Sequence, residues 1–172
     1  RQRLLEWQNE WQKAYNGDLN VHPVLRANAA MWKECNIPLE YSQIFLNKML
    51  QDTEKNRYAT YAELEDYMYG SATVVGYMMS YIIGFKDGAL PYAKALGEAF
   101  QLTNFLRDIK EDLTRGRIYI PQEDMVNHAV IEKDFSNEKM SDDMMDLIYF
   151  EIKRNQDLYD IAKKGIPMLN KS

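Results

Sequence analysis

Three polar residues spaced one helical turn apart constrain the fold of this chain more than any other feature. Asn104, Asp108 and Asp112 follow one another at intervals of four, so on a helix their side chains line one face, and Gln101 extends this stripe by a turn. Most of the remaining circumference is apolar, through Phe100, Leu102, Phe105, Leu106, Ile109 and Leu113. A helix that is apolar on nearly every side is expected to be buried. The pattern therefore predicts a buried helix that carries polar groups in need of compensation.

The stripe offers only oxygen ligands, which are the ligands that Mg²⁺ accepts, usually with water and substrate phosphates completing the shell. Three basic side chains close by can meet an anion: Arg107, Arg115 and Arg117. These residues predict a Mg²⁺–diphosphate site in a helical bundle. The spacing alone equally allows Asp108 and Asp112 to lie on a solvated face, with Arg107 and Glu111 forming an ordinary i, i+4 ion pair. The apolar surroundings favour the site.

Length and composition narrow the class of protein. The chain has 172 residues, enough for one domain with a core, and its net charge of −5 argues against a nucleic-acid partner. A single cysteine, Cys35, excludes an intramolecular disulfide framework and suits a reducing, cytoplasmic compartment. Residues 67–85 carry no charge and approach membrane-spanning length, but their polar groups recur at helical spacing, which favours a buried core helix. Peripheral membrane association stays open.

Helical patterns follow one another along the chain, separated by breaks rich in Gly, Pro and Asn, and no segment reads as a strand. Thr60 and Glu63 match a capping box, and Pro121 suits the first helical position of a short helix that reaches Met125. We expect an all-α fold of about six or seven helices around one core. The expected helices span residues 1–16, residue 23 to the break at residue 36, and residues 39–52, 60–84, 90–114 and 141–164.

A second acidic cluster, from Ser141 to Asp146, contains a literal Asp-Asp-x-x-Asp. It stands where a helix needs a cap, with Ser141 at the N-cap and two aspartates in the first turn, where they complement the helix dipole. We interpret this cluster as a helix start and not as a metal site.

Three stretches resemble the squalene/phytoene synthase family, the head-to-head trans-isoprenyl diphosphate synthases. The stretch 100–121 resembles the second aspartate-rich motif of that family and the loop after it, and 67–76 resembles its other signature, with 57–64 as the lead-in. Met68 stands in place of the usual cysteine, and Ser71 and Thr73 in place of valine and glycine. This variant looks most like bacterial and archaeal phytoene synthases.

The resemblance implies an isoprenoid synthase type of helical bundle around a central cavity. It also implies condensation of two prenyl diphosphates, most simply geranylgeranyl diphosphate to phytoene, through a cyclopropyl intermediate with loss of diphosphate. Asp108 and Asp112 would bind Mg²⁺, or Mn²⁺ in its place, and Asn104 would complete that face. Gln101 and Arg107 would contact the diphosphate or its hydrogen-bond shell.

The same resemblance assigns residues to the cavity. Tyr67 would lie near the carbocation, or near the proton that must be removed, and act through its ring or its hydroxyl. Ser71 and Val75, one and two turns further on, would line the prenyl tunnel together with Met78 and Met79.

The family also has a first aspartate-rich motif upstream and a further helix downstream, and neither is present here. We therefore expect residues 1–172 to form a single helical domain that is the middle and greater part of an isoprenoid synthase domain, with doubtful activity by itself. Three alternatives stay open: a squalene or dehydrosqualene synthase that uses farnesyl diphosphate, a prenyl diphosphate phosphatase on the same fold, and a catalytically incomplete fragment or partner subunit. NADPH would be needed only for squalene, and no Gly-x-Gly-x-x-Gly fingerprint is present.

Overall fold

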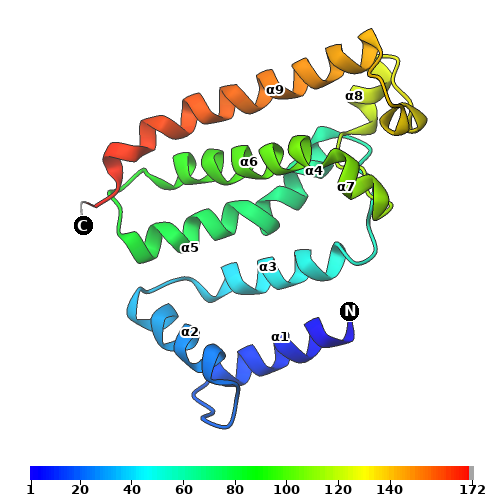
Figure 1. Cartoon of the computed structure of the whole chain (residues 1–172). Helices are drawn as coiled ribbons and strands as arrows, with labels where there is room; N and C mark the ends of the chain where they lie inside the picture. Colours follow the sequence, from blue (N-terminus) through cyan, green and yellow to red (C-terminus); the bar gives the residue numbers. More distant parts are fainter. Residues whose placement is uncertain (171–172) are drawn as a thin grey trace.

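A computed structural model describes residues 1–170 of the chain, and it is built from helices (Figure 1). The first half contains α1 (Gln2–Tyr15), α2 (Pro23–Glu34), α3 (Leu39–Gln51), α4 (Tyr61–Met68), the π-helix η1 (Tyr69–Thr73) and α5 (Val74–Ile83). The second half contains α6 (Leu90–Arg107), α7 (Ile109–Thr114), α8 (Gln122–Asn127), the 3₁₀ helix η2 (Glu132–Ser136), α9 (Asp142–Ala162) and the 3₁₀ helix η3 (Lys163–Met168). Among the described residues one isolated bridge, between Phe85 and Leu169, is the only extended pairing. The predicted all-α class is confirmed.

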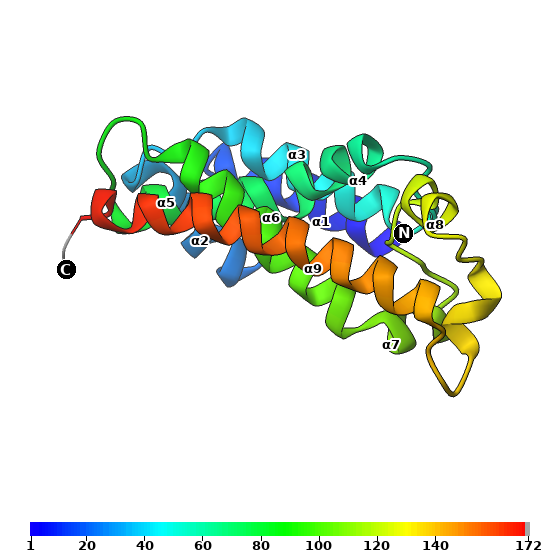
Figure 2. The ribbon, with the colours of Figure 1, turned by 90° about the horizontal axis from the view of Figure 1, so that it is seen from above.

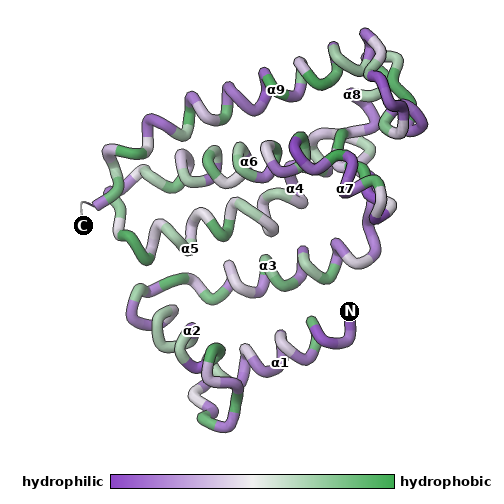
Figure 3. The backbone as a smooth tube through the Cα atoms, in the orientation of Figure 1, coloured by the Kyte–Doolittle hydropathy of each residue, from purple (hydrophilic) through white to green (hydrophobic). Residues whose placement is uncertain are grey.

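Five of the helices lie side by side in the order α1, α3, α5, α6 and α9, so that each contacts the next (Figure 1). Seen from above, α9 runs lengthwise over α6 (Figure 2). In Figure 3 α5 is largely hydrophobic, whereas α7 carries both hydrophilic and hydrophobic residues. No helix within residues 1–170 has both the length and the apolar character needed to cross a membrane.

Two predicted helix starts are present. The Thr60 hydroxyl accepts a hydrogen bond from the Glu63 backbone N–H at 3.2 Å, but the Glu63 carboxylate accepts from the N–H of Ala59, at 2.8 Å, and not from that of Thr60. The capping box is therefore shifted by one residue on its carboxylate side. Ser141 caps α9 by accepting from the N–H of Met144 at 3.2 Å, which confirms that the acidic cluster there begins a helix.

Two long helices expected from the sequence are interrupted. The segment 60–84 contains the π-helix η1 between α4 and α5, and the segment 90–114 breaks at Asp108, whose φ of −100° and ψ of 13° lie outside the helical region. Pro121 is the N-cap of α8 and not its first helical residue. The interruption at η1 belongs to a tight crossing with α6, because a Cβ added to Gly97 would lie 2.8 Å from the carbonyl oxygen of Ala72.

The expectation that α6 and α7 are buried nearly all round is wrong. Leu102 and Phe105 are buried, but Phe100 is 55% exposed, Asn104 is exposed, and α7 contains no buried residue. The reason is that α6 packs against α4, α5 and η1 on one side and against α9 on another, which leaves its remaining face uncovered among the described residues.

Candidate active site

The oxygen-rich stripe keeps its spacing across the break in the helix. The backbone N–H of Asp108 donates to the carbonyl of Asn104 at 2.9 Å, and that of Asp112 donates to the carbonyl of Asp108 at 2.8 Å. These two bonds have the i to i−4 pattern of an α-helix, so the three residues remain one turn apart. Asp108 and Asp112 are half-buried, whereas Asn104 is exposed. The predicted alignment of the stripe is confirmed, although the helix that carries it is kinked.

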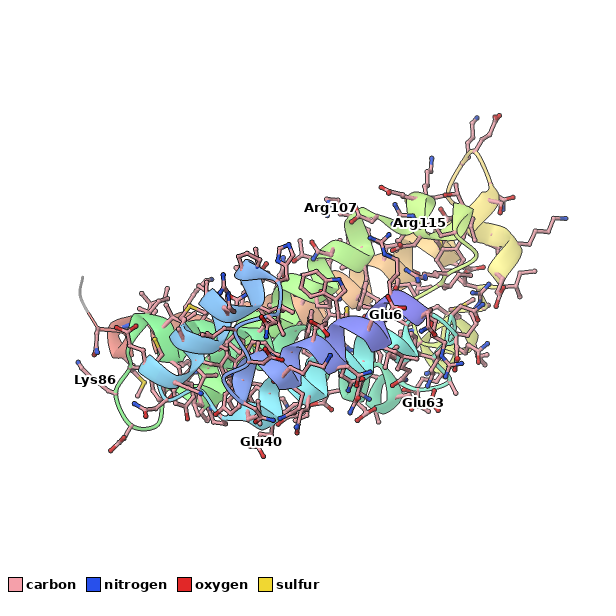
Figure 4. The ribbon with its side chains drawn as sticks, turned by 90° about the horizontal axis from the view of Figure 1, so that it is seen from below. Glu6, Glu40, Glu63, Lys86, Arg107 and Arg115 are labelled. Atoms are coloured by element: carbon pink, nitrogen blue, oxygen red, sulfur yellow. The ribbon has the colours of Figure 1, made fainter. Side chains whose placement is uncertain are left out.

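The ion pairs around the stripe differ from those expected if Asp108 and Asp112 lay on an ordinary solvated face. Arg107 donates to both carboxylate oxygens of Asp108 at 2.7 Å, and this contact lowers the pKa of Asp108. Glu111 pairs with Arg115 at 2.5 Å, so the alternative pairing of Arg107 with Glu111 is wrong. Figure 4 shows Arg107 and Arg115 at the same end of the molecule, far from the labelled Lys86. Burial raises the pKa of Asp112, and the negative charge of Asp108 raises it further.

The stripe fits a magnesium ion that is shared with an anionic ligand. The negative charge of Asp108 raises the pKa of Asp112, and a divalent cation between the two carboxylates would relieve this repulsion; carboxylate and amide oxygens are also ligands suited to Mg²⁺. Within residues 1–170 no three acidic, His or Cys side chains converge into a complete metal site. The stripe would therefore supply only part of a coordination shell for such an ion.

An apolar cavity of about 340 Å³ begins next to the stripe, between α5, α6 and the end of α9. Ser71 and Val75, predicted to line a prenyl tunnel, lie in its wall together with Met79. Gln101 also lines this cavity, which places the first residue of the stripe in the cavity wall. The Ser71 hydroxyl is buried and has no hydrogen-bond partner among the described residues, so it forms a polar point in an apolar surface.

A second apolar cavity, of about 350 Å³, lies between α5 and the first three helices. Met78 lines this cavity and not the first one, whereas Val75 contributes to both. Three tryptophans enclose it: Trp7, Trp11 and Trp32. Their common placement depends on the turn between α1 and α2, which a linear pattern does not specify.

Tyr67 lies outside both cavities, and its hydroxyl points to Asp52, the residue that follows α3. The Tyr67 side chain is 3% exposed, and its hydroxyl donates to Oδ1 of Asp52 at 3.0 Å. The Tyr119 hydroxyl donates to the same oxygen at 3.0 Å, and Arg117 lies 3.1 Å from Oδ2 of Asp52. Arg57 forms an ion pair with Glu132 at 2.7 Å.

Aromatic rings surround this polar cluster. Phe105 and Tyr119 stack with ring centroids 4.1 Å apart, and Tyr67 lies 5.8 Å from Tyr119 and 5.3 Å from Tyr58. Burial raises the pKa of Tyr119 to about 12, and the charge of Asp52 adds to this effect. The pKa of Tyr67 is also raised, first by burial and then by the neighbouring Tyr119 and Asp52. Both phenols therefore stay protonated at neutral pH.

Backbone hydrogen bonds join the two chain segments that carry this cluster. The N–H groups of Ile118 and Gln122 donate to the carbonyls of Asn56 and Tyr58, at 3.1 and 2.9 Å. The segment after Asp52 is thereby joined to the loop that carries Arg117 and Tyr119. No sequence pattern indicates this pairing, because its partners are about sixty residues apart and neither segment has the alternation of a strand.

Comparison with known proteins agrees with this geometry. A family model described as squalene/phytoene synthase matches residues 1–172. A phytoene synthase from Arthrospira platensis is 32% identical over 183 aligned positions, which cover 96% of this chain and 59% of that protein. A 15-cis-phytoene synthase from Synechocystis sp. is 39% identical over 133 positions, which cover 70% of this chain and 40% of that protein.

Solved structures agree on the fold. The crystal structure of squalene synthase HpnC from Alicyclobacillus acidocaldarius matches 97% of this chain and 64% of that one, with a TM-score of 0.90 and 28% identity. A dehydrosqualene synthase in complex with ligand matches 98% of this chain and 60% of that one, with a TM-score of 0.91 and 27% identity. Because the family model covers the whole chain and the structural matches cover nearly all of it, the chain belongs to the squalene/phytoene synthase family.

Proposed function

We propose that the complete protein containing this chain condenses two prenyl diphosphates head to head and releases diphosphate, with geranylgeranyl diphosphate as substrate and phytoene as product. The observation that carries the proposal is the position of Gln101, which belongs both to the wall of the apolar cavity and to the oxygen-rich stripe. A ligand with an anionic head at Asn104, Asp108 and Asp112 would extend its hydrocarbon tail into the adjacent cavity. A prenyl diphosphate has this chemistry.

The residues of the stripe would hold Mg²⁺, or Mn²⁺ in its place, through Asp108 and Asp112 with Asn104 beside them. When bound, the metal ion supplies positive charge that stabilises the departing diphosphate. Arg107 holds Asp108 through two hydrogen bonds, and this contact fixes the orientation of that carboxylate before any ligand binds. Gln101 would contact the diphosphate or its hydrogen-bond shell.

The cavity would bind the hydrocarbon tail and exclude water from the reacting carbons. Apart from the Ser71 and Ser80 hydroxyls and the Gln101 amide, its lining side chains are apolar or aromatic, and a prenyl chain has no polar group to satisfy. The names of the relatives favour phytoene, since the curated matches are phytoene synthases. The structural neighbours named for squalene and dehydrosqualene support the farnesyl diphosphate alternative.

The test is product analysis with the complete gene product. We expect incubation with geranylgeranyl diphosphate and Mg²⁺ to give phytoene by chromatography, and farnesyl diphosphate to give less C30 product. Squalene formed only after addition of NADPH would identify the alternative reductive reaction. Release of prenyl alcohol without condensation would identify a phosphatase. If the complete protein consumes neither diphosphate, the enzymatic proposal is wrong.

A further inference from the structure

The Asp52 carboxylate receives more directed contacts than any other group near the stripe. Its Oδ1 atom accepts hydrogen bonds from Tyr67 and Tyr119, each at 3.0 Å, and its Oδ2 atom lies 3.1 Å from Arg117. Arg117 also donates to the backbone carbonyl of Asp52 at 2.9 Å. Four contacts from three side chains therefore meet at one residue, which belongs neither to the stripe nor to the cavity wall.

These contacts fix the direction of both phenolic hydrogens. A carboxylate has no hydrogen to donate, so each hydroxyl must donate to Asp52. The lone pairs of both tyrosine oxygens are then directed away from the carboxylate. Because the rings of Tyr67 and Tyr119 are held among Tyr58 and Phe105, neither phenol can turn far from this orientation.

The surroundings also decide which charge state Tyr67 keeps. Burial, the neighbouring tyrosines and the negative charge of Asp52 all oppose formation of a phenolate. Arg117 opposes this tendency at Tyr119, but burial and the Asp52 charge prevail there too. Tyr67 therefore stays a neutral phenol that donates its hydrogen bond to Asp52.

We propose that Asp52 is a positioning residue, which holds Tyr67 and Tyr119 as hydrogen-bond donors and keeps Arg117 beside them in one fixed arrangement. This inference rests on the proposed function, because positioning affects a rate only if the complete protein carries out that reaction. It deepens the proposed function by naming a residue that acts through two tyrosines and an arginine without itself contacting the substrate.

The first test is spectroscopic and does not require activity. Tyrosine labelled with ¹³C at Cζ is incorporated into the complete protein, and the Tyr67 and Tyr119 signals are assigned with Tyr67→Phe and Tyr119→Phe. In Asp52→Asn we expect both signals to shift, because an amide oxygen is a weaker acceptor than a carboxylate. A matched control, Asp66→Asn, removes an exposed acid that pairs with Lys48, and it should leave both signals unchanged. Unshifted signals in Asp52→Asn overturn the inference.

The second test is kinetic. Asp52→Asn should lower kcat by about 10²-fold with little change in KM, because misplaced groups near the reaction reduce the rate without removing a contact to the diphosphate. The double variant Asp52→Asn with Tyr67→Phe should be no slower than the slower single variant, since residues that act as one unit are not additive. Wild-type kcat in Asp52→Asn, a loss confined to KM, or additive losses would each refute the positioning role.

A third variant covers the case in which Asp52→Asn fails to fold. Tyr119→Phe removes only a hydroxyl, and we expect it to shift the Tyr67 signal, because the two phenols share Oδ1 of Asp52. An unchanged Tyr67 signal in folded Tyr119→Phe contradicts the shared acceptor. Failure of the proposed function looks different, because the wild-type protein would then make no condensation product while the spectroscopic results stand.

Discussion

A buried charge cluster between α8 and α9 permits a prediction about stability. Arg154 donates to both oxygens of Glu151, at 3.0 and 2.9 Å, and to Oδ2 of Asp124 at 2.8 Å. Glu151 is 1% exposed and Asp124 is 4% exposed, so one guanidinium serves two carboxylates that are almost out of contact with water. The guanidinium also lies 4.0 Å from the centre of the Tyr61 ring. With both acids ionised, the cluster would keep an uncompensated negative charge.

Burial resolves this imbalance by raising the pKa of Glu151 to about 7, and the charge of Asp124 adds to the effect. The folded protein therefore holds this proton more tightly than the unfolded chain does. The contribution of Glu151 to the free energy of unfolding decreases as pH rises from 4.5, the ordinary pKa of a glutamate, to about 7, and it is constant above that range. At 1.36 kcal/mol per pH unit, the loss between pH 5 and pH 8 is about 2 to 3 kcal/mol.

Glu151→Gln tests this reasoning, because glutamine has the shape of a protonated glutamate and does not titrate. The variant should be more stable than the wild type at pH 8, and its advantage at pH 8 should exceed that at pH 5 by about 2 to 3 kcal/mol. Urea unfolding at constant ionic strength measures both values. As a control, Asp157→Asn removes an exposed acid of the same helix that pairs with Lys153, and its effect should be below about 1 kcal/mol at both pH values. An equal effect of Glu151→Gln at pH 5 and pH 8 would refute the raised pKa of Glu151.

Three further predictions follow from the site and its support. Asp108→Ala and Asp112→Ala should each abolish product formation by the complete protein while leaving the helical circular dichroism intact, and wild-type turnover in both would demote the stripe to a structural feature. Gly97→Val should lower the free energy of unfolding by about 1 to 3 kcal/mol in urea titrations, because a Cβ there would lie 2.8 Å from the Ala72 carbonyl oxygen. Ser71→Val should raise the thermal unfolding temperature, since it removes a buried hydroxyl without a partner; a lower temperature would contradict this reading.

Local signals in the sequence identified most of the helices, because each has its own apolar period and its own ends. The Ser141 cap and the end of α7 at Thr114, two residues before Gly116 with its φ of 72°, depend on residues within a single turn, and both were predicted correctly. The alignment of Asn104 and Asp112 depends only on helical periodicity, and it too was predicted.

Features that depend on packing between helices could not be predicted from the sequence. The open face at Phe100 was missed because apolar composition does not say which neighbours are present to cover a side chain. The π-helix η1 lies where α6 approaches closely at Gly97, a contact between segments that a linear pattern does not show. The contacts of Asp52 could not be predicted either, because the two phenols that donate to it come from separate parts of the chain.

The proposed chemistry depends on the register of α6, which means the position of the stripe relative to the residue that lines the cavity. Gln101 lies in the cavity wall, and Asn104 and Asp108 follow on the same helical face toward the α7 end. Each residue of an α-helix turns the side-chain direction by about 100°, so inserting one residue between Gln101 and Asn104 would turn the carboxylates by that angle relative to the cavity wall. The kink at Asp108 leaves this register unchanged, because both backbone hydrogen bonds that flank it keep the four-residue spacing. The anionic head and the hydrocarbon tail of the proposed substrate would then be bound along one face that continues from α6 across the kink into α7.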